Sequence, residues 1–384
     1  MPTIRPRVVA DNVYESQTSY TIDIDLPTKG ILSTLWLLCR AKTETDGSFM
    51  SAYMRNLISS VSVNQAGQDA LNAARPNHFA ADYFYKTGKM PRMGMRYMGV
   101  AGSIEEMIPI LFGDNERDME HTVDLGELSD PQISVTYDLA GVDREGLSIW
   151  DEDVYPTFTV IADLIEGAGI PASKGYQSLR QVETYNPANS EIHLHELKGS
   201  RPIKTIYIQG DNTSFDYRMD QYIDEITIHG DNEAYVPFRM KFERYKEYIR
   251  ALYGNCKVAV EIRHIANFRP TDGIVEERLM TRYELKNTTD RMAWCHGGSG
   301  RNFMTYLVEV DDGTRPAAGT NEWGYYHAEG LAPWSVYPIE MKKLLNLDYL
   351  DPTLHAPVYL ELDHTSGADT YVDDVRVNIE DLVS

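Results

Sequence analysis

Basic residues, cysteines and long apolar runs are all scarce in this 384-residue chain, and each scarcity narrows what the protein can be. There are 36 Lys and Arg against 58 Asp and Glu, which gives a formal net charge of -22. A surface of that charge repels phosphate backbones, which disfavours nucleic-acid binding across the whole molecule. The longest apolar run, Gly30–Cys39, is about half as long as a membrane-spanning helix and instead predicts a strand buried on both faces.

The three cysteines, Cys39, Cys256 and Cys295, are an odd number and form no CxxC pair. The first twelve residues also lack the apolar stretch of a signal peptide. A disulfide framework is therefore not expected, and a reducing compartment fits the composition. The sequons at Asn212 and Asn287 are interpreted as chance matches.

Catalytic motifs are also missing. The Gly-rich stretch Cys295–Asn302, "CHGGSGRN", lacks the third glycine of a dinucleotide loop. Arg301 stands where a nucleophile elbow requires glycine, so the stretch is predicted to be a surface loop. His193 and His195 alternate along a strand and could share a metal ion, but no third ligand lies nearby in the sequence. Packed or solvated histidines are the simpler interpretation.

Clusters of acidic residues could hold a structural Ca²⁺ in a loop or between subunits, although none has the spacing of an EF-hand. The clusters are Asp114–Asn115–Glu116, Asp151–Glu152–Asp153 and Asp311–Asp312–Gly313. Solvated loop charge is the simpler interpretation of these clusters. With 58 acidic residues, no particular pair of carboxylates can be selected for glycoside hydrolysis. The sequence therefore assigns no catalytic residue, no metal ligand and no cofactor-binding residue, and no cofactor is expected.

What the sequence does contain is a long internal repeat. "ISSVSVNQAGQDAL" (Ile58–Leu71) and "IDEITIHGDNEAYV" (Ile223–Val236) each alternate β-branched residues and then break into small and polar ones. This pattern is typical of a strand followed by a turn. Shortly before each phrase comes a Lys-Gly pair and an apolar strand, with Leu35–Leu37 corresponding to Ile206–Ile208.

The repeat continues after the opening phrases. A predicted helix ends at Gly88 in the first half and at Gly254 in the second, 30 and 31 residues after the isoleucine that opens each phrase. An Asp-Pro pair, at Asp130 and at Asp351, then precedes an alternating strand in each half. The Gly- and Pro-containing stretch between the halves, "GAGIPASKG", is typical of a linker. Many short strands with few helices indicate an antiparallel β sandwich or barrel in each half.

Three segments resemble the first barrel of double jelly-roll major capsid proteins, which build tailless icosahedral viruses, including membrane-containing bacteriophages. They are "GILSTLWLLCRA", "LISSVSVNQAGQDAL" and "PILFGDNERDMEHTVDLGELSDPQISVTYDL". The most suggestive piece is Pro109–Gly113 with the Asp-rich turn after it. The resemblance extends over both halves, from Ser19 to Val383, the second half matching mainly in organisation.

The resemblance implies an all-β fold of two tandem eight-stranded jelly-roll barrels, with a few short helices in the connecting loops. The expected divisions are an N-terminal arm (1–18), a first jelly roll (19–166), a linker (167–175) and a second jelly roll (176–384). A long surface loop is expected near 296–330.

The resemblance also implies a non-enzymatic viral major capsid protein, which forms homotrimeric, pseudo-hexameric capsomers that tile an icosahedral shell. Its partners would be further copies of itself and other virion proteins, such as penton or minor capsid proteins, in a virion assembled in the host cytoplasm. Arg5 and Arg7 lie before any acidic residue, so the N-terminal arm could contact an internal membrane or the genome. The alternatives are a carbohydrate-active or carbohydrate-binding β sandwich, such as a depolymerase or adhesin, and a viral spike or vertex protein.

Overall fold

The computed structural model describes most of the chain, and the statements below concern these residues. They are 2–43, 51–65, 70–91, 95–97, 102–140, 150–211, 222–254, 256–264, 291–295, 305–309, 322–330, 332–333, 336–368 and 374–383. Of the six strands β4, β7 and β17–β20, only the backbone is described.

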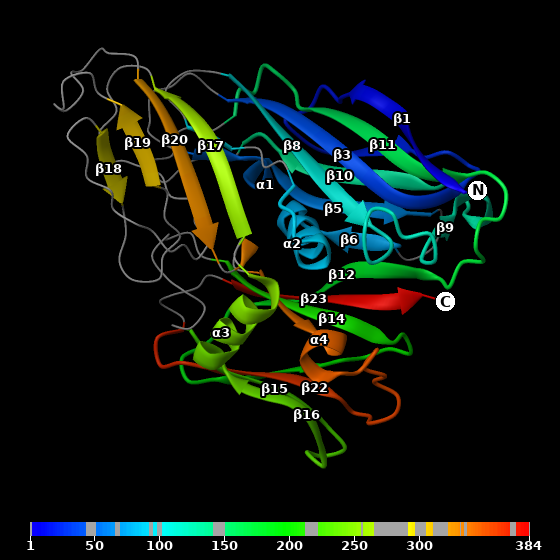
Figure 1. Ribbon diagram of the computed structural model, residues 1–384, viewed down its shortest axis with the longest axis vertical. Helices are drawn as coiled ribbons and strands as arrows, with labels where there is room; N and C mark the ends of the chain where they lie inside the picture. Colours follow the sequence, from blue (N-terminus) through cyan, green and yellow to red (C-terminus); the bar gives the residue numbers. More distant parts are fainter. Residues whose placement is uncertain are drawn as a thin grey trace.

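The first half forms a sandwich of two antiparallel sheets (Figure 1). One sheet has the order β1-β11-β3-β8, with β9 also paired to β3. The other has the order β2-β10-β5-β6. The bounds are β1 (Thr3–Val13), β2 (Ser19–Asp25), β3 (Ile31–Thr43), β5 (Ile58–Asn64), β6 (Asn72–Ala74), β8 (Gly102–Leu111), β9 (Val123–Asp124), β10 (Gln132–Asp138) and β11 (Thr157–Glu166).

The second half repeats this arrangement. Its sheets have the orders β12-β23-β14-β21 and β13-β22-β15-β16. The bounds are β12 (Tyr176–Tyr185), β13 (Ile192–Glu196), β14 (Ile203–Asp211), β15 (Ile223–Gly230), β16 (Tyr235–Lys241), β21 (Val336–Glu340), β22 (Tyr359–His364) and β23 (Asp374–Val383). In both halves the eight strands, numbered along the chain, pair in the orders 1-8-3-6 and 2-7-4-5. That is the jelly-roll connectivity, and it confirms the predicted fold of two eight-stranded barrels.

The repeat holds at the level of single residues. The two opening phrases form β5 and β15, each third in its own sheet. Trp36 of β3 pairs with Ile161 and Pro109, and Tyr207 of β14 pairs with Asn378 and Pro338. The first strand of each barrel also carries a bulge at the same place, between Val8 and Ala10 in β1 and between Gln181 and Glu183 in β12. Each sheet position in one barrel therefore has a defined equivalent in the other.

The cores follow from the alternation seen in the sequence. Val61 and Val63 of β5 pair with Val135 and Ile133 of β10, and all four side chains are buried. Each such side chain stabilises the fold by about 1.5–3 kcal/mol through removal of apolar surface from water. Strand β3 is buried on both faces only near its start. Beyond Leu35 its outward side chains are less buried than its inward ones, so the prediction of a strand buried on both faces holds for part of its length.

Two sequence expectations were wrong. The expected arm over residues 1–18 contains β1, which pairs along β11, and Arg5 and Arg7 both contact the Glu166 carboxylate. Pro6 argued against a strand, but β1 lies at a sheet edge, where proline is tolerated because one side of the strand needs no partner.

The expected surface loop near 296–330 also contains strands. There β19 (Thr305–Glu309) and β20 (Glu322–Gly330) belong to a four-stranded sheet with β17 (Cys256–His264) and β18 (Arg291–Cys295). The segment is too polar for these strands to be recognised from the sequence.

Helices occupy the connections between strands. The fifth and sixth strands of each barrel are joined through a twelve-residue helix, α2 (Pro76–Thr87) in the first and α3 (Phe242–Tyr253) in the second. The shorter elements are α1 (Met54–Leu57), α4 (Met341–Leu345), a 3₁₀ turn (Leu125–Glu127), and the paired strands β4 (Ser51–Tyr53) and β7 (Met95–Tyr97). Among the described residues, no helix combines the length and apolar character needed to cross a membrane.

A shared sheet joins the two barrels. Ala73 of β6 pairs in parallel with Arg180 of β12, so one sheet of each barrel merges into a single sheet of eight strands. The chain between β11 and β12 is also held, because the Lys174 amide donates to the Glu120 carbonyl (2.7 Å) and the Thr122 amide to the Gly175 carbonyl (2.9 Å). Cys39 is a free, buried thiol, and the side chains of Cys256 and Cys295 lie outside the described part of the molecule.

The two helix-ending glycines differ in backbone conformation, which predicts different tolerance to substitution. Gly88 is left-handed (φ 72°, ψ 8°), a conformation that Asn also adopts, whereas Gly254 (φ 72°, ψ -160°) lies in a region open almost only to glycine. A Cβ at either position would meet no atom within 4 Å. Gly88→Asn should therefore cost less than about 1 kcal/mol of unfolding free energy, and Gly254→Asn about 1–3 kcal/mol. Urea titration of both variants measures this, and equal losses would contradict the assignment.

Candidate functional site

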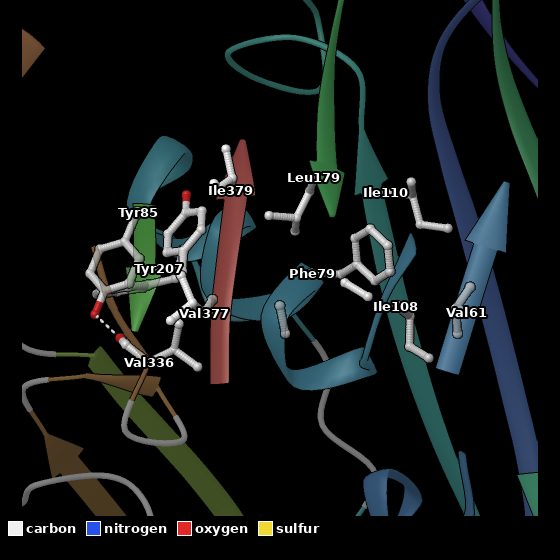
Figure 2. Packing of buried hydrophobic residues seen from close by; sticks show 14 of the residues in the cluster. Val61, Phe79, Tyr85, Ile108, Ile110, Leu179, Tyr207, Val336, Val377 and Ile379 are labelled. Atoms are coloured by element: carbon white, nitrogen blue, oxygen red, sulfur yellow. Dashed lines mark hydrogen bonds between the residues drawn. The ribbon is translucent and has the colours of Figure 1, made fainter. Parts of the chain in front are cut away.

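The most elaborate polar site in the described part of the chain is the junction where α2 lies between the barrels. Ten consecutive residues of α2, from Pro76 to Tyr85, are buried. On one side Phe79 is directed toward Ile108 and Ile110 of the first barrel, and on the other Tyr85 lies beside Tyr207 of the second (Figure 2). The Tyr85 hydroxyl donates to the Val336 carbonyl (2.7 Å). We use "junction" for α2 together with the outward face of the β12-β23-β14-β21 sheet.

A buried lysine occupies the centre of the junction. Lys86 lies 3.0 Å from Asp82 one helical turn earlier and also contacts Glu380 of β23. The side chains of Lys86, Asp82 and Glu380 are only 8%, 3% and 1% exposed. The Tyr207 hydroxyl donates to Asp82 (2.7 Å), and the Thr205 hydroxyl donates to Glu380 (2.9 Å). One ammonium group thus contacts two carboxylates, one from each barrel.

Further charged residues surround a small cavity beside this pair. Lys204 contacts Asp114 and lies 3.9 Å from Glu380. Lys343 lies 2.8 Å from Glu340, which also accepts a hydrogen bond from the Tyr253 hydroxyl (2.6 Å). The cavity measures about 210 Å³, and these lysines and carboxylates line it. Lys342 also lines the cavity, and it lies 3.5 Å from Asp348 outside it.

The electrostatics of the junction favour a structural role. Burial raises the pKa of Asp82 to about 6; Glu380 adds to this shift and Lys86 opposes it. Burial also raises the pKa of Glu380, but ion pairing with Lys204 and Lys86 outweighs it and holds the pKa below its ordinary value. Burial would lower the pKa of Lys86, yet its two carboxylates raise it. A lysine that acts as a nucleophile or base needs a depressed pKa, so Lys86 is suited to holding the barrels together.

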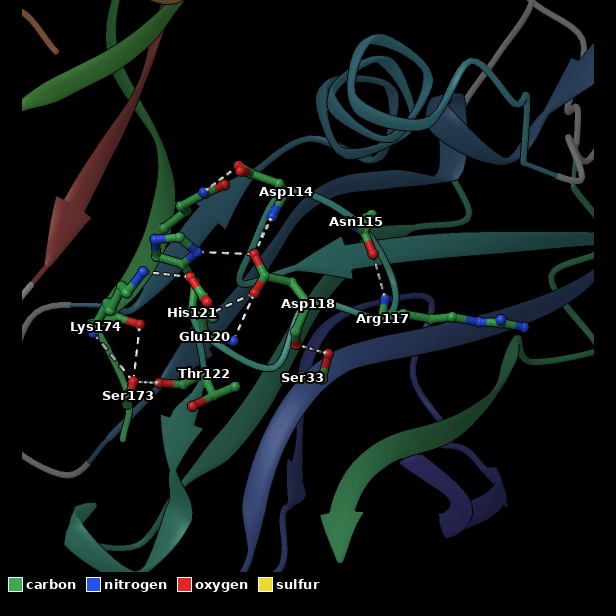
Figure 3. A network of polar contacts seen from close by, with 12 residues as sticks. Ser33, Asp114, Asn115, Arg117, Asp118, Glu120, His121, Thr122, Ser173 and Lys174 are labelled. Carbon is green, nitrogen blue, oxygen red and sulfur yellow. Dashed lines mark hydrogen bonds and ion pairs between the residues drawn. The ribbon is translucent and has the colours of Figure 1, made fainter. Parts of the chain in front are cut away.

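The first acidic cluster lies in a loop that supports the junction (Figure 3). Asp114, Asp118 and His121 bring potential ligand atoms within 4.8 Å of one another, the one such group of three among the described residues. The Asp118 carboxylate, however, accepts from the amides of Asp114 (2.9 Å), Glu120 (2.8 Å) and His121 (3.1 Å), and lies 2.9 Å from His121 Nδ1. Protein donors therefore account for its acceptor sites.

Asp114 contacts the second barrel from the loop that follows β8. Burial would raise the pKa of Asp114, but its ion pair with Lys204 lowers the pKa below the ordinary value. The Gln177 side-chain amide also donates to Asp114 (2.6 Å). Asp114, the first residue of the acidic cluster Asp114–Glu116, thus links the first barrel to β12 and β14.

The two histidines share a face of β13, as predicted, and a third residue lies between them. Glu183 of β12 is 3.1 Å from His193 Nε2 and 2.6 Å from His195 Nδ1. The Tyr185 ring stacks on His193 with centroids 3.5 Å apart. Burial lowers the pKa of His195, against the opposing effect of Glu183. These are packed histidines whose ring nitrogens face the Glu183 carboxylate where β13 lies beside β12.

Of the remaining candidate clusters, one makes ordinary polar contacts and the others lie outside the described residues. Asp151 contacts Lys42 (2.6 Å) and accepts from the Asp153 amide (3.1 Å). The Gly-rich residues 296–302, the cluster 311–313 and both sequons lie outside the described part of the chain. Sequence reasoning missed the junction, although Asp82 and Lys86, four residues apart in the predicted helix, were a visible signal.

Asp82 should make stability depend on pH in a defined direction. Its pKa is raised above that of an unfolded Asp, about 3.9. Its contribution to the unfolding free energy is therefore fully present below about pH 3.9 and is lost as the pH rises through about 6. The unfolding free energy of the native protein, relative to Asp82→Asn, should fall by about 1–3 kcal/mol between pH 4 and pH 7. Urea titrations over this range test it, with the exposed Glu152→Gln as control. Parallel pH profiles for native protein and Asp82→Asn would contradict the assignment.

Removing the shared ammonium group should lower the unfolding free energy more than neutralising all three charged side chains of the network. Lys86→Met leaves two buried carboxylates without their partner and should cost about 3–5 kcal/mol. The triple variant Lys86→Met, Asp82→Asn, Glu380→Gln buries no unpaired charge there and should recover most of that loss. Thermal unfolding of the two variants at pH 7 provides the comparison. A triple variant no more stable than Lys86→Met would show that the charges do not act as a unit.

Comparison with known proteins identifies the fold. No family model matches the sequence, and no curated protein is significantly similar to it. Among solved structures, the chain is similar to the crystal structure of the STIV major capsid protein, with a TM-score of 0.61 and 10% identity over 99% of this chain and 97% of that one. It is also similar to a chain in the atomic structure of Sulfolobus Turreted Icosahedral Virus (TM-score 0.59, 10% identity, 99% and 91% covered).

A quasi-atomic model of the PBCV-1 virus capsid is a third similar structure, with a TM-score of 0.54 and 11% identity over 99% of this chain and 93% of that one. At such identities the likeness is one of fold. It extends over both barrels and agrees with the strand orders described above. The chain therefore has the double jelly-roll fold found in these viral capsid proteins.

Proposed function

We propose that this protein is a viral major capsid protein that assembles as a homotrimer. The observation that carries the proposal is the pair of equivalent barrels held together by a shared sheet and a buried ionic junction. A chain built in this way presents two similar lobes in a fixed relation. Three copies then supply six lobes, which suits a position with six neighbours in an icosahedral shell.

Self-association is the proposed mechanism. Burial of apolar surface between copies supplies the driving force, and polar rims set the register. No catalytic step and no cofactor is part of the proposal.

An enzymatic or carbohydrate-binding role has less support. Ligand sites usually measure about 300–1,000 Å³ and keep a few polar groups available for the ligand. The cavity at the junction is smaller, about 210 Å³, and Lys204 and Lys343 in its lining are each paired with a carboxylate there. A spike or vertex protein would not require two equivalent barrels in one chain.

Location and partners follow from the proposed function. The protein would reside in the virion after assembly in the host cytoplasm, and it would contact neighbouring capsomers and penton or minor capsid proteins. Contact with an internal membrane or the genome through the N-terminal residues remains part of the proposal, because the side chains of Arg5 and Arg7 are 68% and 60% exposed although both contact Glu166.

The trimer can be tested by mass. Sedimentation velocity of the purified protein at micromolar concentration should give about 131 kDa, three times the 43.6 kDa chain. Each contact should bury more than about 1,000 Å² in total, as stable interfaces do. A 43.6 kDa species at every concentration, with no particles under any condition, would overturn the proposed function.

A further inference from the structure

One corner of the second barrel is built from titratable side chains that point into its core. In β13, His193 pairs with Leu362 of β22, and two residues further on His195 pairs with Leu360. Directly paired residues of an antiparallel sheet lie on the same face of it. Both leucines are buried, so the two histidines also point inward, toward β12. Their side chains are only 18% and 15% exposed.

A third histidine completes the corner at the end of β22. His364 is 2% exposed, and its Nδ1 lies 2.9 Å from the Tyr222 carbonyl. A carbonyl oxygen only accepts, so Nδ1 carries the proton, and the Tyr185 hydroxyl donates to Nε2 across 2.9 Å. In this arrangement the neutral ring satisfies both of its neighbours. We use "histidine corner" for His193, His195, His364, Glu183 and Tyr185.

The first barrel closes the same corner with side chains that carry no charge near neutral pH. By strand register, the positions of the three histidines are taken there by Ile22, Ile24 and Tyr137, all buried. In the same way, the positions of Glu183 and Tyr185 are taken by Ala10 and Val13. Closing a jelly roll therefore does not require titratable groups at this corner, and they are a particular feature of the second barrel.

Burial outweighs the charged neighbours at two of the three rings. It lowers the pKa of His195 and the pKa of His364. The charged groups that face these rings, from β12, β13, β22 and the adjoining segments, are Glu183, Glu191 and Asp363, which favour protonation, and His193 and Lys198, which oppose it. An unfolded histidine takes up its proton near about pH 6.5. Because the folded corner resists protonation, acid favours any state in which these rings reach water.

The hydrogen bonds of the corner give the same direction. A proton on His364 Nε2 would remove the acceptor that the Tyr185 hydroxyl now has. The charged ring would then face a carbonyl and a hydroxyl instead of a carboxylate, which is costly for a buried cation. The other two rings share one carboxylate, that of Glu183. Protonation of the closed corner therefore costs free energy.

Strand β13 is the element that can move in response. It has five residues and ends its sheet, pairing with β22 alone in the described part of the chain. Its outward side chains Ile192 and Leu194 are 58% and 50% exposed, so β13 packs on the barrel through the inward face that holds the histidines. Elements with so little buried surface are the first to open locally.

We propose that the histidine corner is an acid-sensitive switch, at which β13 separates from β12 more often as the pH falls below about 6. Protons taken up by His195 and His364 drive the opening. The junction responds in the opposite direction, since the contribution of Asp82 is largest in acid, so the barrels stay joined while the corner opens. The inference concerns the single chain and does not depend on the proposed trimer.

Hydrogen exchange followed by mass spectrometry measures this opening, with the equivalent strand β2 as a control in the same molecule. Protection of the β13 amides, corrected for the intrinsic effect of pH on exchange, should fall about tenfold or more between pH 7 and pH 5, because a pKa difference of one unit is a factor of ten. Strand β2 lies at the uncharged corner of the first barrel and should keep its protection.

The double variant His195→Asn, His364→Asn tests the residues. An Asn amide can replace the Nδ1 contact of each ring and does not titrate. Protection of β13 in this variant should change as little with pH as that of β2. The matched control is His355→Asn, which removes a histidine that contacts Asp231 elsewhere in the second barrel. This control should retain the full loss of protection in acid.

Each outcome bears on the switch. Equal loss of protection in β13 and β2 of the native protein, or no loss in β13, overturns it whatever the variants do. A folded double variant that still loses β13 protection in acid also overturns it. If the double variant does not fold, the single variants decide, since each should lose less protection than the native protein. A monomeric native protein with the expected β13 behaviour would contradict the proposed trimer and support the switch.

Discussion

The structure depends on burying a lysine between two carboxylates that belong to different barrels. Each charged group would be costly to bury alone, and the arrangement is stable because Lys86 contacts both Asp82 and Glu380. Tyr207 and Thr205 supply further hydrogen bonds to these carboxylates. Because the charges are satisfied only when α2 lies against β14 and β23, the network fixes how the barrels are placed relative to each other.

A fixed relation between the barrels is what a two-lobed building block requires. The shared eight-stranded sheet sets the direction of the strands across the junction, and α2 fills the space between the barrels with Phe79 on one side and Tyr85 on the other. The loop organised by Asp118 adds a third link, because Asp114 within it contacts Lys204 of the second barrel. The two barrels are thereby held together as one unit.

The sequence predicted those parts of the fold that local patterns encode. Alternation at Val61 and Val63, and at Ile226 and Ile228, identified equivalent strands, and Gly88 and Gly254 marked the ends of equivalent helices. Strand β1 was missed because edge strands need little alternation and tolerate Pro6. The junction was missed because Asp82 and Glu380 lie far apart along the chain, and no local pattern relates them.

The central claim is that one chain supplies two rigidly joined, equivalent barrels, which three copies arrange into a ring of six. Single-particle electron microscopy of the purified assembly, reconstructed without imposed symmetry, tests this most directly. The account predicts six lobes of two alternating kinds. A ring with a different number of lobes, or barrels whose relative orientation varies from particle to particle, would contradict it.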